Sequence, residues 1–300
     1  MEHNNSFPNI INNIKRDLEP IQNFKLIRAK DGVHVYKCLY EDAPAVAKYF
    51  ENEDDKREIL NYRILARHNI PTIKTLALAK STIVMEDITF SENWRLGIPE
   101  DLEDAGVAKA LASWYFIFHE SGSAVPELDT LYFEYDSITE DNLKMLIAKL
   151  PEAEELFGFL LARYEKLREL IYKPSFTLTY NDFYWVNFVV RKDKKVAMMF
   201  DYNLMGKGYR FSDYRNVCWS MSKDAKAAFT DEYNRLYFEK HNHTRAEAEK
   251  LEECIENIAG PLFSLFTAFT KHENFPDWAK SFKEEAINGG LLSKAKQLLL

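Results

Sequence analysis

Residues 176–201 read FTLTYNDFYWVNFVVRKDKKVAMMFD, and the interpretation of the whole chain depends on this stretch. Two apolar runs in it, residues 176–179 and 196–200, are rich in the residue types that favour β-strands. Asp182 lies three residues beyond the first run, and Asp201 directly follows the second. A carboxylate at the end of a buried strand is costly unless a cation meets it, so both positions are candidates for a functional site.

Asn187 adds a carboxamide between these two carboxylates, just before a third apolar run at residues 188–190. Two carboxylates and one carboxamide that converge at strand ends offer oxygen ligands suited to Mg²⁺, with one carboxylate left over as a base. Asp and Asn are also common turn formers in an ordinary β-hairpin. The stretch alone leaves both interpretations open.

The order of these residues resembles a known family. D-x-x-x-x-N followed by a strand-terminal Asp is the spacing of the kinase catalytic loop and metal-binding Asp. The local sequence is similar to that of the aminoglycoside phosphotransferase and choline kinase superfamily, whose loop reads roughly H-[GN]-D-x-x-x-x-N and whose metal strand ends I-D. The matching residues here are Tyr180-Asn181-Asp182, Asn187 and Phe200-Asp201. The Asn-Asp pair favours the choline and ethanolamine kinase branch, while Tyr180 replaces a His that is mainly a scaffold residue in the family.

The resemblance implies an α+β fold of the bilobal protein-kinase-like type. We expect a small nucleotide-binding N-lobe, residues 1–87, with a five-stranded antiparallel sheet plus one helix. The larger C-lobe, residues 88–300, should be mostly helical, with a short catalytic β-hairpin and the catalytic and substrate-binding residues. Apolar runs predict strands at residues 24–29, 33–40, 43–50, 73–79 and 82–85. Helical periodicity predicts helices at residues 7–22, 54–68, 102–120, 138–150, 151–172, 225–240, 245–259, 262–272 and 278–286, and a last short one after Gly289-Gly290.

Lys48 interrupts the apolar strand AVAKYF at residues 45–50. A lysine on a strand is most often solvated on the polar face. Here it resembles the third-strand lysine that pairs the ATP phosphates in kinases, and that lysine needs a helical glutamate to hold it. The next helix supplies Glu58, which shares a helix face with Tyr62 and Leu65. The resemblance therefore implies a Lys48–Glu58 pair, with a solvated surface glutamate as the alternative.

Two further segments resemble nucleotide-contacting parts of a kinase N-lobe. The turn that contains Gly32 joins the first two predicted strands and would lie over the nucleotide phosphates, although Asp-Gly pairs also merely close hairpins. The run IVMED at residues 83–87 is similar to the family's hinge. The resemblance implies that the backbone near Glu86 and Ile88 binds adenine.

The resemblance also implies a role for each residue of the catalytic segment. Asp182 would be the catalytic base, and Asn187 and Asp201 would be the Mg²⁺ ligands. Asp213 matches a family Asp that anchors the catalytic loop, so Asp213 and Tyr180 should give structural support. These assignments require ATP (or GTP) and Mg²⁺ as cofactors.

Composition narrows the classes of partner. The formal net charge is −8, from 47 acidic and 39 basic residues, which argues against nucleic acid as the main partner. The most apolar segment, residues 258–269, is too short to span a membrane. The N-terminus, MEHNNSFPNI, lacks the basic and apolar regions of a signal peptide, and the three cysteines show no metal spacing. We therefore expect a cytoplasmic protein whose partners are a nucleotide and a small molecule.

The sequence and the resemblance together predict a small-molecule kinase. We expect it to move the γ-phosphoryl group of ATP to a hydroxyl of a small cationic molecule, aminoglycoside-like or choline/ethanolamine-like. A nucleotide-binding pseudokinase with little turnover is the alternative, because Tyr180 replaces the usual His and the phosphate loop has few glycines. A protein kinase is disfavoured, because the chain has no D-F-G or A-P-E motif.

Overall fold

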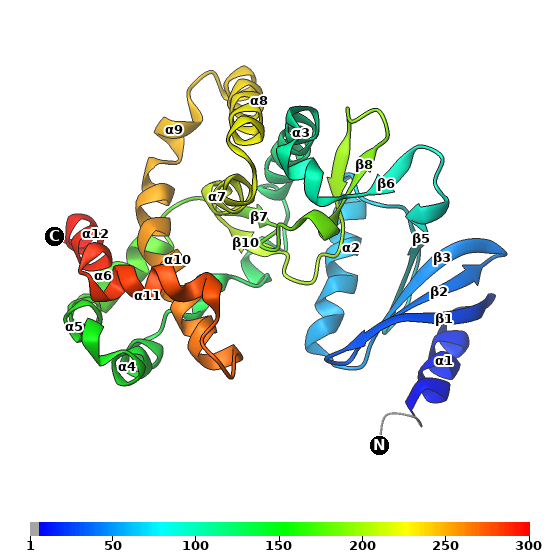
Figure 1. The fold of residues 1–300 in the computed structure, drawn as a ribbon, viewed down its shortest axis with the longest axis horizontal. Helices are drawn as coiled ribbons and strands as arrows, with labels where there is room; N and C mark the ends of the chain where they lie inside the picture. The colour runs from blue at the N-terminus through cyan, green and yellow to red at the C-terminus, as the bar shows by residue number, and fades with distance from the viewer. Residues whose placement is uncertain (1–5) are drawn as a thin grey trace.

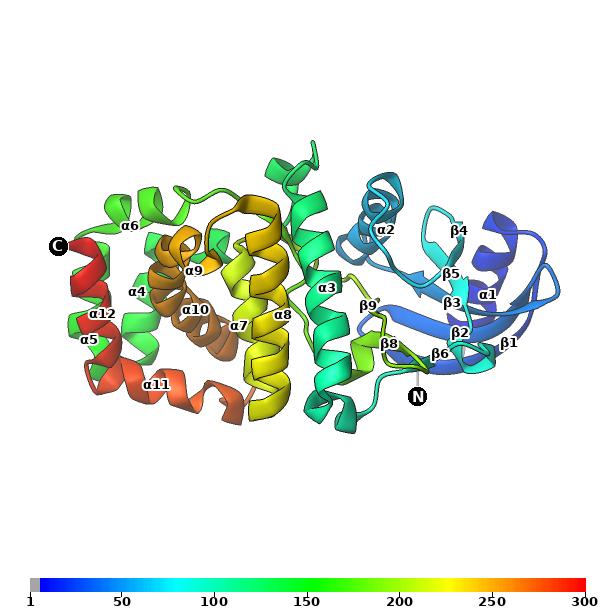
Figure 2. The ribbon, with the colours of Figure 1, turned by 90° about the horizontal axis from the view of Figure 1, so that it is seen from above.

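The computed structural model describes residues 6–300, which form a five-stranded sheet at one end of an elongated molecule and a helical body at the other (Figures 1 and 2). The sheet is antiparallel throughout, with strand order β1-β2-β3-β5-β4. Its strands are β1 (Ile21–Lys30), β2 (Val33–Tyr40), β3 (Ala43–Phe50), β4 (Thr75–Leu78) and β5 (Thr82–Glu86). The predicted α+β architecture with a five-stranded antiparallel N-terminal sheet is confirmed.

Two helices cover opposite faces of this sheet. Successive side chains of a strand point to opposite faces, so neighbouring residues of β3 contact different helices. Helix α1 (Ser6–Asp17) packs Ile10 and Ile14 against Ala45 and Ala47 of β3. Phe50 of β3 instead joins a second core cluster that includes buried residues of α2 (Arg57–Arg67). Lys48, two residues before Phe50, therefore points to the α2 side of the sheet.

The helical body contains two packed cores. One core continues from the α2 side of the sheet into α3 and α8, and the other joins α4, α5, α6, α10 and α12. The helices are α3 (Ala105–Gly122), α4 (Glu140–Lys149), α5 (Glu154–Leu161), α6 (Tyr164–Ile171), α7 (Arg210–Ser220), α8 (Lys223–His241), α9 (Arg245–Ala248), α10 (Lys250–Lys271), α11 (Lys280–Ile287) and α12 (Gly290–Leu299). Within residues 6–300, no helix has the length and apolarity needed to cross a membrane.

Short strands build the region between the sheet and the helical body. The predicted hairpin is present, as β8 (Phe188–Arg191) pairs with β9 (Ala197–Met199). Two strands that we did not predict complete the pairing. β6 (Trp94–Leu96) adds to the outer side of β8, and β10 (Gly206–Gly208) pairs with β7 (Thr177–Thr179).

The structure corrects several predicted helix boundaries. The helix predicted at residues 7–22 ends at Asp17, before β1 begins at Ile21, and the helix predicted at residues 245–259 is divided between α9 and α10. The helix predicted at residues 151–172 is broken into a 3₁₀ turn, α5 and α6. The break predicted near residue 260 is absent, because α10 runs unbroken through Pro261. Proline costs a helical hydrogen bond, but residues 258–262 are all buried, so packing outweighs the local preference.

Candidate active site

Lys48 of β3 lies between two carboxylates from distant parts of the chain. Its ammonium nitrogen Nζ is 2.5 Å from Oε2 of Glu58 on α2 and 2.6 Å from Oδ1 of Asp201, which follows β9. The lysine is 7% exposed and Glu58 is fully buried. A buried charge is tolerated when it is paired and hydrogen-bonded, and here a single ammonium serves both carboxylates.

Burial and charge act in opposite directions within this cluster. Burial raises the pKa of Glu58 to about 7, although the Lys48 charge works against that rise. Burial also disfavours the Lys48 ammonium, yet the charges of Glu58 and Asp201 raise its pKa above the usual value. Lys48 therefore stays cationic near neutral pH.

Asp182 lies in the loop between β7 and β8, where the side chain of Asn187 holds it. The Asn187 amide Nδ2 donates to both the backbone oxygen and Oδ2 of Asp182, each at 3.0 Å. Burial raises the pKa of Asp182 to about 6, the nearby Asp201 charge adds to the rise, and Asn187 and Lys48 oppose it. A carboxylate with this pKa is mostly ionised at pH 7 and is basic enough to accept a proton.

The donor set around Asp201 fits a hard divalent cation. The side-chain nitrogen Nδ2 of Asn187 donates to Asp182, so the side-chain oxygen Oδ1 of Asn187 is left for a metal. Lys48 contacts only Oδ1 of the Asp201 carboxylate, so Oδ2 is left as well. No group of three or more His, Cys, Asp and Glu side chains suited to a metal occurs in the described part of the chain. One carboxylate and one amide oxygen suit Mg²⁺, which usually keeps waters and substrate phosphates as its other ligands.

Tyr180 and Asp213 support the loop that carries Asp182. The carboxylate of Asp213 accepts hydrogen bonds from the backbone N–H groups of Tyr180, at 2.7 Å, and Asn181, at 3.0 Å. The Tyr180 hydroxyl donates to the backbone oxygen of Phe200 at 2.5 Å and also reaches that of Asp201 at 3.1 Å. These contacts link the Asp182 loop to the strand that ends in Asp201.

His119 of α3 also takes part in this support, although the sequence analysis assigns it no role. Its Nε2 lies 3.2 Å from Oδ2 of Asp213, and its Nδ1 lies 2.6 Å from the Tyr233 hydroxyl. Full burial lowers the pKa of His119, with Asp213 acting against that change. Its burial beside Asp213 depends on the packing of α3 against α7, which the local sequence does not reveal.

The remaining predicted nucleotide contacts lie on the sheet and at its exit. Gly32 adopts φ +81° in the β1–β2 turn, where an added Cβ would meet the Asn52 side chain at 2.5 Å. Glu86 ends β5, and its carboxylate accepts from the Lys74 N–H at 2.8 Å. Ile88 is the buried first residue of a short 3₁₀ helix whose other two residues are exposed, and its N–H makes no hydrogen bond to any residue between 6 and 300. That N–H is left for a ligand such as a nucleotide base.

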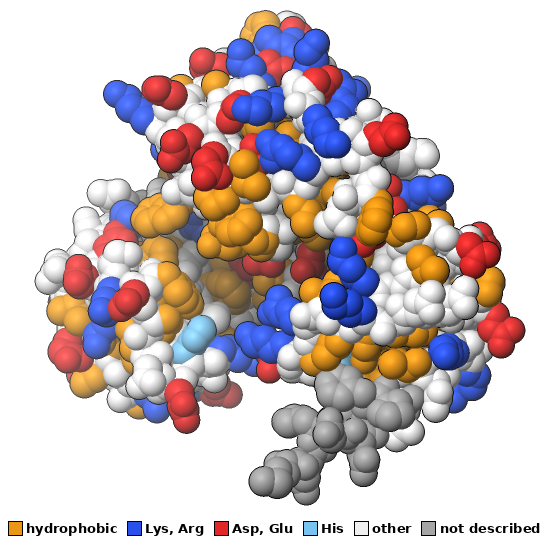
Figure 3. Space-filling model, turned by 45° about the vertical axis from the view of Figure 1, so that its right-hand side comes forward, with side chains coloured by type: hydrophobic (Ala, Val, Ile, Leu, Met, Phe, Trp, Pro, Cys, Tyr) orange, Lys and Arg blue, Asp and Glu red, His pale blue; other side chains and the backbone are white. Residues whose placement is uncertain are grey.

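Glu134 is a further acidic residue near Asp182, and no sequence motif indicated it. Burial and the charge of Glu256 raise its pKa to about 8, while Arg215 opposes the rise and Asp182 adds to it. Arg215 pairs with the fully buried Glu256 at 2.6 Å, and Glu256 also accepts from the hydroxyl groups of Tyr135 and Ser212. Because Arg215 is paired with Glu256, its charge only partly offsets the rise, and at pH 7 Glu134 is mostly a neutral carboxyl group that a nearby cation would favour in its ionised form. Figure 3 shows acidic side chains at the base of a hollow near the middle of the face that it draws.

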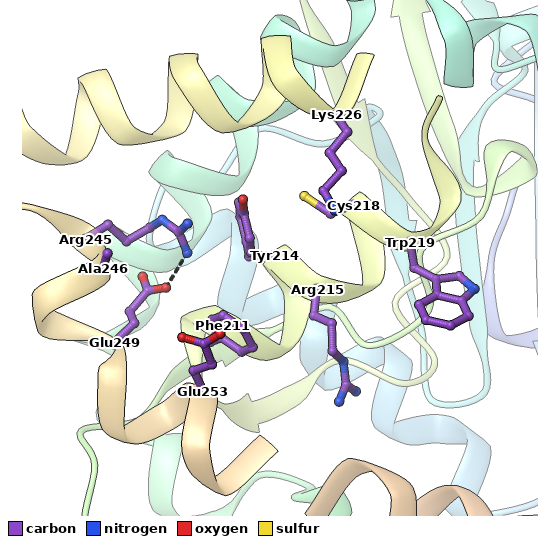
Figure 4. Close-up of a pocket in the computed structure, with 10 residues that line it drawn as sticks. All are labelled: Phe211, Tyr214, Arg215, Cys218, Trp219, Lys226, Arg245, Ala246, Glu249 and Glu253. Atoms are coloured by element: carbon purple, nitrogen blue, oxygen red, sulfur yellow. Dashed lines mark hydrogen bonds and ion pairs between the residues drawn. The ribbon is translucent and has the colours of Figure 1, made fainter. Parts of the chain in front are cut away.

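A cavity of about 360 Å³ lies elsewhere, among α7, α8, α9 and α10 (Figure 4). Phe211, Tyr214 and Cys218 of α7 line it, and the exposed Trp219 stands at its edge. At 3.6 residues per turn these positions lie on the face of α7 opposite Asp213, which contacts the catalytic loop. Arg215, which pairs with Glu256 and whose charge acts on Glu134, also lines the cavity.

Comparisons with known proteins bear on the fold. No protein-family model and no curated protein matches the chain. Solved structures do match, among them a macrolide 2'-phosphotransferase from Brachybacterium faecium, at 14% identity and a TM-score of 0.56, covering 93% of this chain and 98% of that one. An ethanolamine kinase from Plasmodium vivax matches at 15% identity and a TM-score of 0.56, covering 93% of this chain and 87% of that one.

A third match is a spectinomycin phosphotransferase solved with ADP and spectinomycin, at 13% identity and a TM-score of 0.52. The match covers 97% of this chain and 98% of that one. The similarity extends over nearly the whole length of each protein. The chain therefore has the fold of these small-molecule phosphotransferases and kinases, as the resemblance in its sequence predicts.

Proposed function

We propose that this protein is a small-molecule kinase that transfers the γ-phosphoryl group of ATP to a hydroxyl of a small cationic molecule. The observation that carries the proposal is the position of Lys48, whose ammonium lies within 2.6 Å of carboxylates on α2 and after β9. This arrangement joins the N-terminal sheet to the catalytic segment. We propose residues 1–87 as the nucleotide-binding lobe and residues 88–300 as the catalytic and substrate-binding lobe.

Asp182 is the proposed catalytic base. It would accept the proton of the acceptor hydroxyl as the oxygen attacks the γ-phosphorus, while the bond from that phosphorus to the β–γ bridging oxygen breaks and ADP leaves. Its pKa of about 6 and the Asn187 hydrogen bond to its Oδ2 support this role. Holding the base and the acceptor in the right geometry supplies much of the rate gain in such a transfer.

The negative charge of the triphosphate needs cationic partners in the cleft. Lys48 supplies one, held by Glu58, and the backbone of the Gly32 turn would cover the phosphates. Asn187 and Asp201 would hold Mg²⁺, which when bound supplies positive charge next to the transferring phosphoryl group. The base would bind at the hinge near Glu86 and Ile88, where the Ile88 N–H makes no hydrogen bond within residues 6–300.

A cationic acceptor is supported by the charge around Asp182. Glu134 lies near enough to Asp182 for the Asp182 charge to raise the pKa of Glu134, and Arg215 is already paired with Glu256. An ammonium group on the acceptor would relieve this repulsion, whereas an anionic acceptor would increase it.

ATP-dependent chemistry and cysteines that form no disulfide in residues 6–300 suit the cytoplasm, where we propose that the protein acts.

The proposal is tested by ATP consumption with a panel of acceptors. The purified protein would be incubated with Mg-ATP or Mg-GTP and with amino alcohols, aminoglycosides and uncharged sugars, and nucleoside diphosphate release would be measured. We expect release that depends on a cationic acceptor and is absent in Asp182→Asn. If Mg-ATP raises the melting temperature but no acceptor stimulates release, the protein is a nucleotide-binding protein with little turnover, and the kinase assignment is wrong.

A further inference from the structure

The segment that carries Asp201 is held in an unusual way. Every backbone carbonyl from residue 199 to residue 205 accepts a hydrogen bond from a side chain outside the segment. The donors come from two places: α2 and its following loop, and the catalytic loop. They are Arg57, Asn61, Thr72, Tyr180 and Asn181.

Asn61 of α2 makes two of these contacts. Its amide Nδ2 donates to the Tyr202 oxygen at 2.8 Å and to the Met205 oxygen at 3.4 Å, and the residue is 1% exposed. One turn earlier on the same helix face, Arg57 donates from Nε to the Asn203 oxygen at 2.7 Å. The guanidinium of Arg57 also stacks 4.9 Å above the ring of Tyr132. The two side chains span the turn that follows Asp201.

This turn needs external support. Asp201 has φ +62°, in the left-handed region that is costly for residues other than glycine. Such a conformation persists only when its surroundings hold it. The Asp201 N–H lies 3.3 Å from the Tyr62 hydroxyl, so α2 contacts the segment at Asp201 itself as well as beyond it.

We propose that Asn61 and Arg57 are positioning residues that fix the Asp201 segment from the N-terminal side of the cleft. The inference rests on the proposed function only in naming the group that Asp201 would bind. The same helix carries Glu58, which holds Lys48, so α2 sets both the lysine and the Asp201 carboxylate. One helix thereby positions two of the groups that would face the nucleotide.

The test compares Asn61→Ala and Arg57→Ala with Arg63→Ala, an exposed position of the same helix that lacks contacts with the segment. Amide hydrogen exchange is measured in the nucleotide-free protein, and the Mg²⁺ dependence of ADP binding is measured by calorimetry. We expect exchange in residues 199–206 to accelerate roughly tenfold in Asn61→Ala, and less in Arg57→Ala, while Arg63→Ala matches the wild type. We expect the apparent Mg²⁺ affinity to weaken about tenfold, with metal-free ADP binding unchanged.

Exchange that rises evenly over the whole chain, or an unchanged Mg²⁺ dependence, would overturn the proposal, since a purely structural role predicts only general loosening. If Asn61→Ala does not fold, Arg57→Ala decides the question by the same criteria. If the wild type binds no Mg-nucleotide, the kinase proposal fails, and the exchange experiment still decides whether Asn61 and Arg57 hold this segment.

Discussion

The ammonium of Lys48 lies 2.6 Å from Oδ1 of Asp201, although 153 positions separate the two residues in the sequence. The contact joins a strand of the N-terminal sheet to the end of the β8–β9 hairpin. Because Lys48 also pairs with the buried Glu58, the same ammonium stabilises the fold and forms part of the proposed nucleotide site. These two roles can be separated by mutation.

Lys48→Met should lower both stability and activity, whereas Lys48→Met combined with Glu58→Leu should recover stability alone. The single change leaves Glu58 buried without its partner, which costs about 3 kcal/mol. The double change replaces the pair with apolar groups, which is often nearly neutral. Urea unfolding and turnover measure the two properties. A single variant as stable as the wild type would show that the pair contributes little to folding.

Asp182→Asn should lower kcat by roughly 10²- to 10⁴-fold, because a positioned general base contributes about that much. The affinity for Mg-ADP should stay close to the wild-type value, since Asp182 is proposed to contact the acceptor rather than the nucleotide. Asp193→Asn is the matched control, as Asp193 is an exposed carboxylate in the β8–β9 turn. Near-normal turnover in Asp182→Asn would remove Asp182 from the role of base.

The pH dependence of kcat/KM should reflect the raised pKa of Asp182, which is about 6. The base must be ionised to accept a proton, so activity should be constant above pH 7 and should fall as pH drops through about 6. An ordinary aspartate would keep its charge to about pH 4. A profile between pH 5 and 8 with an acceptor of constant charge measures this. A flat profile down to pH 5 would contradict the assignment.

Much of the fold follows from local sequence. Strand β2 alternates buried and partly exposed residues, and the β1–β3 strands are joined by short polar turns, so these strands can be predicted without tertiary information. The strand-terminal positions of Asp182 and Asp201 are equally local features. Their proximity to Lys48 depends on how the sheet packs on the helical body, so it could be predicted only from the resemblance to a known family.

Other elements of the fold could not be predicted from local sequence, because contacts with distant parts of the chain stabilise them. The three-residue strands β6 and β10 form only against partners far along the chain, and the Gly-Lys-Gly sequence of β10 has little strand preference of its own. The unbroken course of α10 through Pro261 reflects burial on the helical core. Glu134 and His119 became candidates only once their buried neighbours were known.

Glu134→Gln should raise the melting temperature at pH 8, and the gain should shrink towards pH 5. The folded-state pKa of Glu134, about 8, lies above the unfolded value near 4.5, so the ionised form disfavours folding. Between these two values the unfolded state binds fewer protons, and wild-type stability falls as pH rises. Scanning calorimetry at several pH values tests this. The same variant should raise KM for a cationic acceptor, and a lower melting temperature at pH 8 would contradict the prediction.

Tyr180→Phe should weaken the link between the catalytic loop and the Asp201 segment. The Tyr180 hydroxyl bonds the Phe200 oxygen at 2.5 Å in a fully buried position, so its loss leaves that carbonyl without this donor and costs about 1–3 kcal/mol. We expect the melting temperature to fall by a few degrees and kcat to fall roughly tenfold, while Tyr184→Phe, at an exposed position of the same loop, changes neither. Equal behaviour of the two variants would show that the hydroxyl has no special role. Tyr180→His introduces the residue that the resembling loop motif has at this position, and activity above that of Tyr180→Phe would show that a ring donor is what this position requires.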